Sequence, residues 1–148
     1  MTDFFKSSYS FLNIARIASV AGILLILSSC SDSASLEKDR KALMDLHDKE
    51  MAKMGQIFSL KEQLNVLSDS VSSAEEKAML KERIDRLQEA NESMMDWMRN
   101  YQDPAADTPA DEQKAYYANE MVKMKQVESL IGQSIDSAQI LLKNYQSR

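Results

Sequence analysis

The sequence predicts an all-α protein: an antiparallel up-down-up three-helix bundle, coiled-coil-like, that follows an N-terminal signal helix. Three observations predict it. The 148 residues contain three glycines and two prolines, which leaves few points where the backbone is expected to turn tightly. Apolar residues recur every three or four positions over three long stretches, as on one face of a helix. The stretches have similar lengths and short connections, which favours antiparallel neighbours.

The start of the chain is typical of an export signal. It carries Lys6 and Arg16 against one acid, Asp3, and the following run Ile17–Leu27 contains no charge. A basic start, a short apolar run and small residues at the cleavage point are the pattern of a signal peptide. A transmembrane helix needs roughly 20 apolar residues, so this run is short for one, and an uncleaved membrane anchor is the disfavoured alternative. We therefore predict that residues 1–29 are a signal peptide.

Cys30 is the only cysteine, so no disulfide within the chain is expected. The ending Leu27-Ser28-Ser29-Cys30 resembles the lipobox of bacterial lipoproteins. The resemblance implies a lipid on the thiol of Cys30, cleavage before it, and a further acyl chain such as palmitate on the new amino terminus. Several acyl chains anchor a protein stably where a single chain is marginal. We expect residues 30–35 to be the lipidated cysteine and a polar tether.

The expected location is the bacterial cell envelope, on the outer membrane and facing the periplasm, because Ser31 rather than aspartate follows the cysteine. Residues 36–148 have the length of one ordinary domain. The chain carries 23 acidic and 18 basic residues, a net charge of −5. An acidic surface of mixed sign argues against nucleic acid as a partner, which requires clustered Lys and Arg.

The first helix is predicted over residues about 36–67. Ser35 suits its N-cap, and Glu37 lies in its first turn. The side chains that share one helical face are Leu36, Leu43, Leu46, His47, Met54, Ile57, Leu64 and Leu67.

The second helix is predicted over residues about 74–102. Ser72 and Ser73 are each followed three residues later by a glutamate, which gives two overlapping capping boxes. Its apolar seam then recurs at alternating four- and three-residue spacing. Pro104 disfavours helix in the preceding residue and ends the stretch.

The third helix is predicted over residues about 109–146. Pro109 stands at its first position, where a missing amide costs nothing, and Thr108 with Asp111 forms a capping box. Its stripe consists of Tyr117, Met121, Met124, Leu130, Ile131, Ile135, Ala138, Leu141, Leu142 and Tyr145.

Folding the three helices back about turns near residues 71 and 105 predicts which residues lie level with one another. His47 is expected at the same height along the bundle as Met95, and Met95 at the same height as Tyr116. Eight of the nine methionines after Cys30, all except Met79, then gather at one end of the bundle.

Two interpretations of this cluster stay open. Methionine fills irregular core space well, and its helical spacing here favours that interpretation. The alternative is a site for a soft ion such as Cu(I), which thioether and imidazole ligands select. The candidate ligands are His47, Met51, Met54, Met94 and Met98, with Trp97 as a cover over the ion. No other cofactor is expected.

Other chemistries are disfavoured. Di-iron bundles need paired Glu-x-x-His motifs, and this chain has a single histidine, with Met44 where the glutamate would stand. Structural zinc would need cysteines or further histidines. The acidic residues, including Glu75 and Glu76, are expected to be solvated faces and helix caps. We therefore expect that this protein is not an enzyme.

Two motifs carry a family resemblance. His47-Asp48-x-x-Met51-x-x-Met54 and the later Met94-Met95-x-Trp97-Met98 resemble short bacterial envelope lipoproteins labelled "viral A-type inclusion protein". The resemblance covers nearly the whole chain after Cys30 and implies that the His and Met positions belong to the family motif. It implies no activity.

These observations predict a non-catalytic, lipid-anchored envelope protein that acts as a helical interaction or structural module. One alternative is a periplasmic Cu(I)- or Ag(I)-binding lipoprotein that stores or hands over metal. Another is a coiled-coil module whose apolar surface is completed by a protein partner. His47 lies eleven residues beyond Leu36, about 16 Å along a helix. The cluster is therefore expected near the membrane surface.

Overall fold

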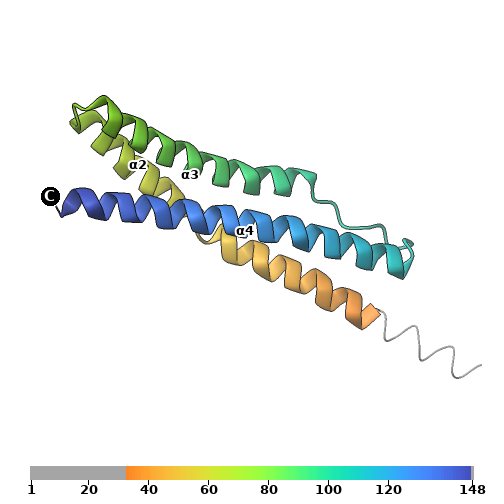
Figure 1. The fold of residues 1–148 in the computed structure, drawn as a ribbon. Coiled ribbons are helices and arrows are strands. Elements are labelled where there is room, and N and C mark those ends of the chain that lie inside the picture. The colour runs from red at the N-terminus through yellow and green to blue at the C-terminus, as the bar shows by residue number, and fades with distance from the viewer. Residues whose placement is uncertain (1–32, 148) are drawn as a thin grey trace, which may run out of the picture. The chain divides into compact units, whose positions relative to one another are not determined.

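The computed structural model describes residues 33–147, and every regular element in that range is a helix (Figure 1). Residues 33–51 are helical and are followed by α2 (Met54–Ser70), α3 (Ala74–Asn100) and α4 (Ala110–Gln146). The chain divides into two compact units after Lys38, and the bundle lies in the second unit. In this unit α3 packs against both α2 and α4. The predicted all-α, antiparallel up-down-up bundle is confirmed.

The first arm of the bundle is interrupted, whereas the sequence predicted one continuous helix over 36–67. The amide of Lys53 donates to Glu50 O at 3.0 Å, and the amide of Gln56 donates to Lys53 O at 3.0 Å. These bonds span three residues and form turns in place of the regular helical ladder. Gly55 follows directly, and glycine weakens a helix by up to about 1 kcal/mol relative to alanine. The prediction of an unbroken helix was therefore wrong.

The N-terminal boundary of the first arm also differs from the prediction. Residues 33–35, expected in the tether, are already helical, so Ser35 is inside a helix and is not its N-cap. Its predicted role in capping was wrong.

The core of the bundle is an apolar seam contributed by all helical segments. Among its largest wholly enclosed apolar side chains, Leu43, Ile57 and Leu64 come from the first arm, and the others are Leu80, Leu87, Met94, Met124 and Ile131. Leu130, predicted on the apolar stripe of α4, is exposed instead. Three polar side chains are buried with the seam: Glu50, Glu120 and Ser134.

The turn into α3 follows the serine chemistry expected from the sequence. Ser73 has extended backbone angles, and its Oγ accepts a hydrogen bond from the amide of Glu76 at 3.4 Å. The same hydroxyl donates to Glu75 Oε2 at 2.8 Å. An N-cap serine satisfies one of the amides that the first helical turn leaves unpaired. This accounts for the start of α3 at Ala74.

The turn into α4 differs from the expected capping box. Pro109 is the N-cap, with φ −53° and ψ 142° and no side-chain cap bond, and α4 begins one residue later at Ala110. Instead, Gln113 Nε2 of α4 donates a hydrogen bond to the backbone oxygen of Thr108 at 2.7 Å. The predicted bond from the Thr108 side chain to Asp111 is replaced by this contact.

The connection between α3 and α4 shifts the register of the bundle. After Asn100, residues 101–105 have no helical structure and continue in the direction of α3 before the chain turns back (Figure 1). Tyr116 lies against Tyr101, whereas the sequence placed it level with Met95. An extended residue advances about 3.3 Å and a helical one about 1.5 Å, so a few extended residues displace the pairing by several helical positions. The predicted pairing of Tyr116 with Met95 was therefore wrong.

Gly132 is a point at which the bundle can be strengthened. It lies in the middle of α4 with no positive φ, and a Cβ there would meet nothing within 4 Å. Because glycine in a helix costs about 0.8–1.0 kcal/mol relative to alanine, Gly132→Ala is expected to raise the free energy of unfolding by up to about 1 kcal/mol. Urea denaturation followed by circular dichroism measures this change. A loss of stability would contradict it and would point to helix packing against Cα.

Candidate functional site

Five aromatic rings form a continuous row at one end of the bundle. The ring centroids of His47 and Trp97 lie 5.4 Å apart, and those of Trp97 and Tyr101 lie 4.9 Å apart. Tyr101 is 6.0 Å from Tyr116, which is 5.7 Å from Tyr117. The row joins the first helical segment, α3, the 101–109 connection and α4. We refer to these five residues as the aromatic row.

The side chain of Trp97 is held in place by a buried carboxylate of α4. Its indole Nε1 donates to Glu120 Oε2 at 2.9 Å, and Lys123 Nζ donates to the other oxygen, Oε1, at 2.6 Å. Hydrogen bonding to Glu120 raises the pKa of Lys123. Each oxygen of Glu120 therefore has a partner, as a buried carboxylate requires. An open groove of about 480 Å³ between α3 and α4 runs beside this pair.

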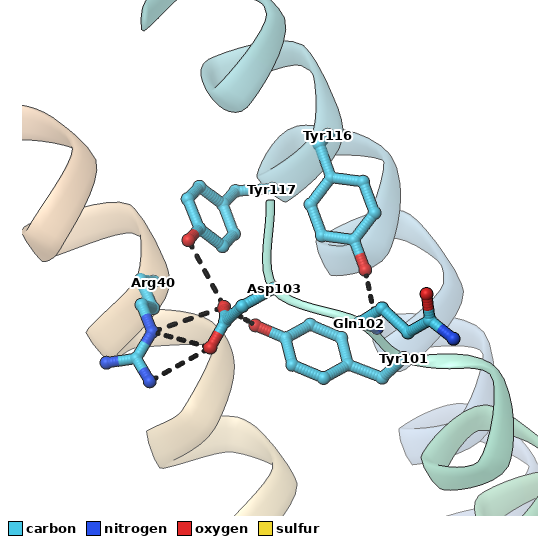
Figure 2. Close-up of polar contacts among 6 residues, drawn as sticks. All are labelled: Arg40, Tyr101, Gln102, Asp103, Tyr116 and Tyr117. Carbon is cyan, nitrogen blue, oxygen red and sulfur yellow. Dashed lines mark hydrogen bonds and ion pairs between the residues drawn. The ribbon is translucent and has the colours of Figure 1, made fainter. Parts of the chain in front are cut away.

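Asp103 is the centre of a second polar group (Figure 2). Arg40 donates to its carboxylate through Nε at 3.2 Å and Nη2 at 3.0 Å. The hydroxyls of Tyr101 and Tyr117 donate to its Oδ1 at 2.5 Å and 3.2 Å. Three side chains from three parts of the chain thus converge on one carboxylate. The group ties the connection after α3 to the first helical segment and to α4.

The same contacts change two pKa values. Hydrogen bonding from Arg40 lowers the pKa of Asp103 below its usual value, despite its partial burial. Burial, followed by the hydrogen bond to Asp103, raises the pKa of Tyr101 well above its usual value. The carboxylate is therefore charged and the phenol protonated over the neutral pH range. Nearby, the amide of Gln102 donates to the hydroxyl of Tyr116 at 3.0 Å, which fixes the backbone of the connection.

The lowered pKa of Asp103 predicts a dependence of stability on acid. An aspartate with a lower pKa in the folded state stabilises the fold above its unfolded pKa, and this contribution is lost as pH falls through the folded value. The side chain is 41% exposed, so solvent screening reduces the effect. We expect Asp103→Asn to lower the melting temperature at pH 7. The difference from the parent should shrink below about pH 4, near the ordinary aspartate pKa. A difference that is constant with pH would contradict this assignment.

A second buried carboxylate lies at the break in the first arm. Glu50 is wholly enclosed, and Lys53 Nζ donates to its Oε1 at 2.9 Å. Its Oε2 lies 2.8 Å from the same ammonium group, an ion pair outside hydrogen-bonding geometry. Lys49 lies 3.5 Å from Glu50 and also bonds Glu128 of α4 at 2.6 Å. This network connects the break to α4.

The structure brings two of the predicted site residues into direct contact. The His47 side chain is largely buried against the Trp97 ring, and its Nδ1 lies 2.9 Å from Asp48 Oδ1. The sequence placed Trp97 as a cover over an ion. In the structure its ring contacts the rings of His47 and Tyr101, and its N–H donates to Glu120.

The predicted methionine ligands have different surroundings. Met94 is wholly enclosed in the core, whereas Met98, one turn further along α3, is 42% exposed. Met51 and Met54 are half-buried and lie on opposite sides of the break, so the regular helical spacing assumed between them does not hold. Within residues 33–147 no group of three or more His, Cys, Asp and Glu side chains is arranged to hold a metal ion.

The expected lipidation site, Cys30, lies outside the described residues, as does the predicted signal peptide. In the part of the chain that the structure describes, no helix has the length and apolar character needed to cross a membrane.

The comparisons with known proteins add no relative. No protein-family model, curated protein or solved structure matches this chain.

The spacing of the buried residues in the first arm indicates a core position for Glu50. Leu43, Glu50, Ile57 and Leu64 are spaced by seven residues, and all four are buried. A seven-residue repeat places its members on one seam of a helical bundle, so Glu50 occupies a core position. The expectation that the acids are solvated faces and caps was wrong for Glu50 and Glu120.

Proposed function

We propose that the chain is a non-catalytic, lipid-anchored protein of the bacterial cell envelope whose helical bundle is an interaction or structural module. The sequence Leu27-Ser28-Ser29-Cys30 after a short apolar run supports the anchor. The resemblance to short envelope lipoproteins supports the same assignment. Such a protein presents its bundle on the outer membrane, facing the periplasm.

One surface feature supports the interaction role most directly. An open groove of about 430 Å³ lies between the C-terminal ends of α2 and α4. Its apolar lining consists of Val66, Leu67, Leu142 and Tyr145, and Val66 is 62% exposed. Large exposed apolar patches mark contact sites for other proteins, and we propose this smaller groove as part of such a site. Completion of the apolar surface by another chain would give a mass in solution that rises with protein concentration.

The anchor is tested by replacing Cys30 with alanine in the full chain expressed in a bacterium. We expect the parent to incorporate labelled palmitate and to sediment with membranes, and Cys30→Ala to do neither. Ser33→Ala, a change of similar size three residues away, is the matched control and should behave as the parent does. Retention of Cys30→Ala in the membrane fraction would contradict lipid anchoring through this residue.

A second candidate function, Cu(I) or Ag(I) binding, is favoured by the geometry of His47. When Nδ1 donates to the Asp48 carboxylate, the ring is fixed in the tautomer whose Nε2 carries the free lone pair. This is the form of imidazole that binds a metal. The thioethers of Met51, Met54, Met94 and Met98 are the further ligands in this proposal, with Trp97 beside them.

The metal proposal is tested by competition between residues 31–148 and a weak chromogenic Cu(I) chelator. We expect the parent to remove Cu(I) from the chelator, and His47→Ala and Met98→Leu to bind it more weakly. Met79→Leu, a change to the one methionine outside the cluster, is the control. Failure of the parent to compete would end the metal proposal. Binding unchanged in both variants would contradict the ligand assignment.

A further inference from the structure

Trp97 and Tyr101 share an unusual arrangement of their acidic protons. The indole N–H of Trp97 is directed at the Glu120 carboxylate, 2.9 Å away. The O–H of Tyr101 is directed at the Asp103 carboxylate, 2.5 Å away (Figure 2). The two rings are in contact, with centroids 4.9 Å apart. These are the two side-chain types that lose a single electron most readily after cysteine, and each has a proton acceptor in place.

Both carboxylates are held in position. Glu120 is only 6% exposed and is bonded through its second oxygen to Lys123. Asp103 is fixed by Arg40 and by the hydroxyl of Tyr117. Loss of an electron makes the phenol O–H strongly acidic and the indole N–H about as acidic as a carboxylic acid, so a carboxylate at hydrogen-bond distance can take either proton. An acceptor already at hydrogen-bond distance allows the proton to leave without solvent rearrangement.

We infer that Trp97 and Tyr101 form a radical-transfer pair, in which an oxidising equivalent received at Trp97 is passed to Tyr101. This activity is separate from anchoring, partner binding and metal binding. It protects the single tryptophan of the chain, because an indole radical that persists reacts irreversibly with oxygen.

The steps balance as follows in protons and electrons. An oxygen-centred radical, such as a peroxyl radical, takes one electron from Trp97 and becomes an anion, and the Nε1 proton moves to Glu120. Tyr101 then gives one electron to the indole radical, Glu120 returns the proton to Nε1, and the phenolic proton of Tyr101 moves to Asp103. The net products are the reduced oxidant, a neutral tyrosyl radical and a protonated Asp103. A small thiol or enediol reductant supplies one hydrogen atom to the tyrosyl radical, after which Asp103 releases its proton to solvent.

The test is pulse radiolysis of the full chain with azide radical, which oxidises indole in preference to phenol. Trp97 is the only tryptophan, so the initial indole radical has one origin. We expect its visible absorption to decay while the phenoxyl band rises at the same first-order rate, independent of protein concentration. Decay that is only second order, with no matching phenoxyl rise, would overturn the proposal.

Two variants assign the acceptor. Tyr101→Phe should slow the phenoxyl rise by at least about tenfold, which corresponds to roughly 1.4 kcal/mol of barrier. Tyr145→Phe, which removes a tyrosine outside the aromatic row, should leave the rate unchanged. Transfer at the parent rate in Tyr101→Phe would overturn the assignment to this residue. Circular dichroism of each variant verifies that the bundle is intact.

The role of Asp103 as proton acceptor is tested by a solvent isotope effect in the parent protein and by one variant. If the phenolic proton moves with the electron, the rate in the parent protein falls in deuterated water. Asp103→Asn retains a hydrogen-bond acceptor but not a base, and we expect it to slow the transfer. A parent rate that is the same in both solvents would overturn the coupled proton step, and so would an unchanged rate in folded Asp103→Asn.

Discussion

Met94→Ala is expected to lower the free energy of unfolding by about 2–5 kcal/mol, the range for truncating a buried large aliphatic side chain or methionine. Met94 is wholly enclosed in the seam of α3, so its removal leaves a cavity that the surrounding core fills only in part. Urea denaturation followed by circular dichroism measures the loss. A reduction well below about 1 kcal/mol would show that the site is less tightly packed than the structure indicates.

Met94→Leu is the matched control because it nearly conserves volume and removes the sulfur. Such exchanges usually cost less than about 1.5 kcal/mol. If Met94 is only a core residue, the leucine variant keeps both stability and any Cu(I) affinity. If its thioether is a ligand, the variant keeps stability but loses affinity. The pair of variants therefore separates the two interpretations of the methionine cluster.

Lys53→Met is expected to destabilise the bundle by about 2–3 kcal/mol, less than the roughly 3–5 kcal/mol for a buried charge left wholly alone. The reason is that the enclosed Glu50 carboxylate would retain only the more distant Lys49, at 3.5 Å. Thermal and urea denaturation at neutral pH measure the loss. Lys41→Met is a control, since Lys41 makes a solvent-exposed pair with Asp45 and should change stability little.

The double variant Glu50→Gln, Lys53→Met tests the cause. Removing the charge of Glu50 removes the penalty for leaving it without Lys53, so the double variant should be more stable than Lys53→Met alone. If the two substitutions simply add, the ion pair is not the origin of the loss.

The sequence was sufficient to predict the fold class because three independent signals agreed. The apolar stripes, the rarity of glycine and proline, and the polar turn at Ser72 and Ser73 each indicate long helices joined by short connections. These are local properties, and a bundle of neighbouring antiparallel helices depends mainly on local properties. The start of α3 at Ala74, for example, follows from one serine and the amide of Glu76.

The break and the register depend on longer-range packing. Gly55 weakens the helix at this point, but the break itself coincides with Glu50 at a core position and with the bond from Lys53 to Glu50. The register of α4 was wrong because residues 101–105 continue away from α3 in non-helical form. Sequence pattern fixes where a helix ends but gives little information on the path that the connecting residues take.

In the candidate site, too, the contacts that follow from local sequence could be predicted and those that depend on longer-range packing could not. The contact between His47 and Trp97 could be predicted from the sequence, because the turn between the first arm and α3 is short. The pairing of Arg40 with Asp103 was not, because it joins residues 63 apart across a connection of irregular path. The buried acid Glu120 was missed because charge was taken as a sign of exposure, although its N–H partner Trp97 compensates the burial.

The break at residues 52 and 53 also affects how the bundle loses structure. In a continuous helix the backbone hydrogen bonds form one uninterrupted series, so unfolding that starts at one end must break each following turn before it can spread. Here the ladder is interrupted, and residues 39–51 can unwind while α2 keeps all of its own bonds. We therefore expect the two parts of the first arm to open separately. Opening of residues 39–51, which carry His47 and Arg40, would expose the aromatic row to solvent while the other helices stay folded.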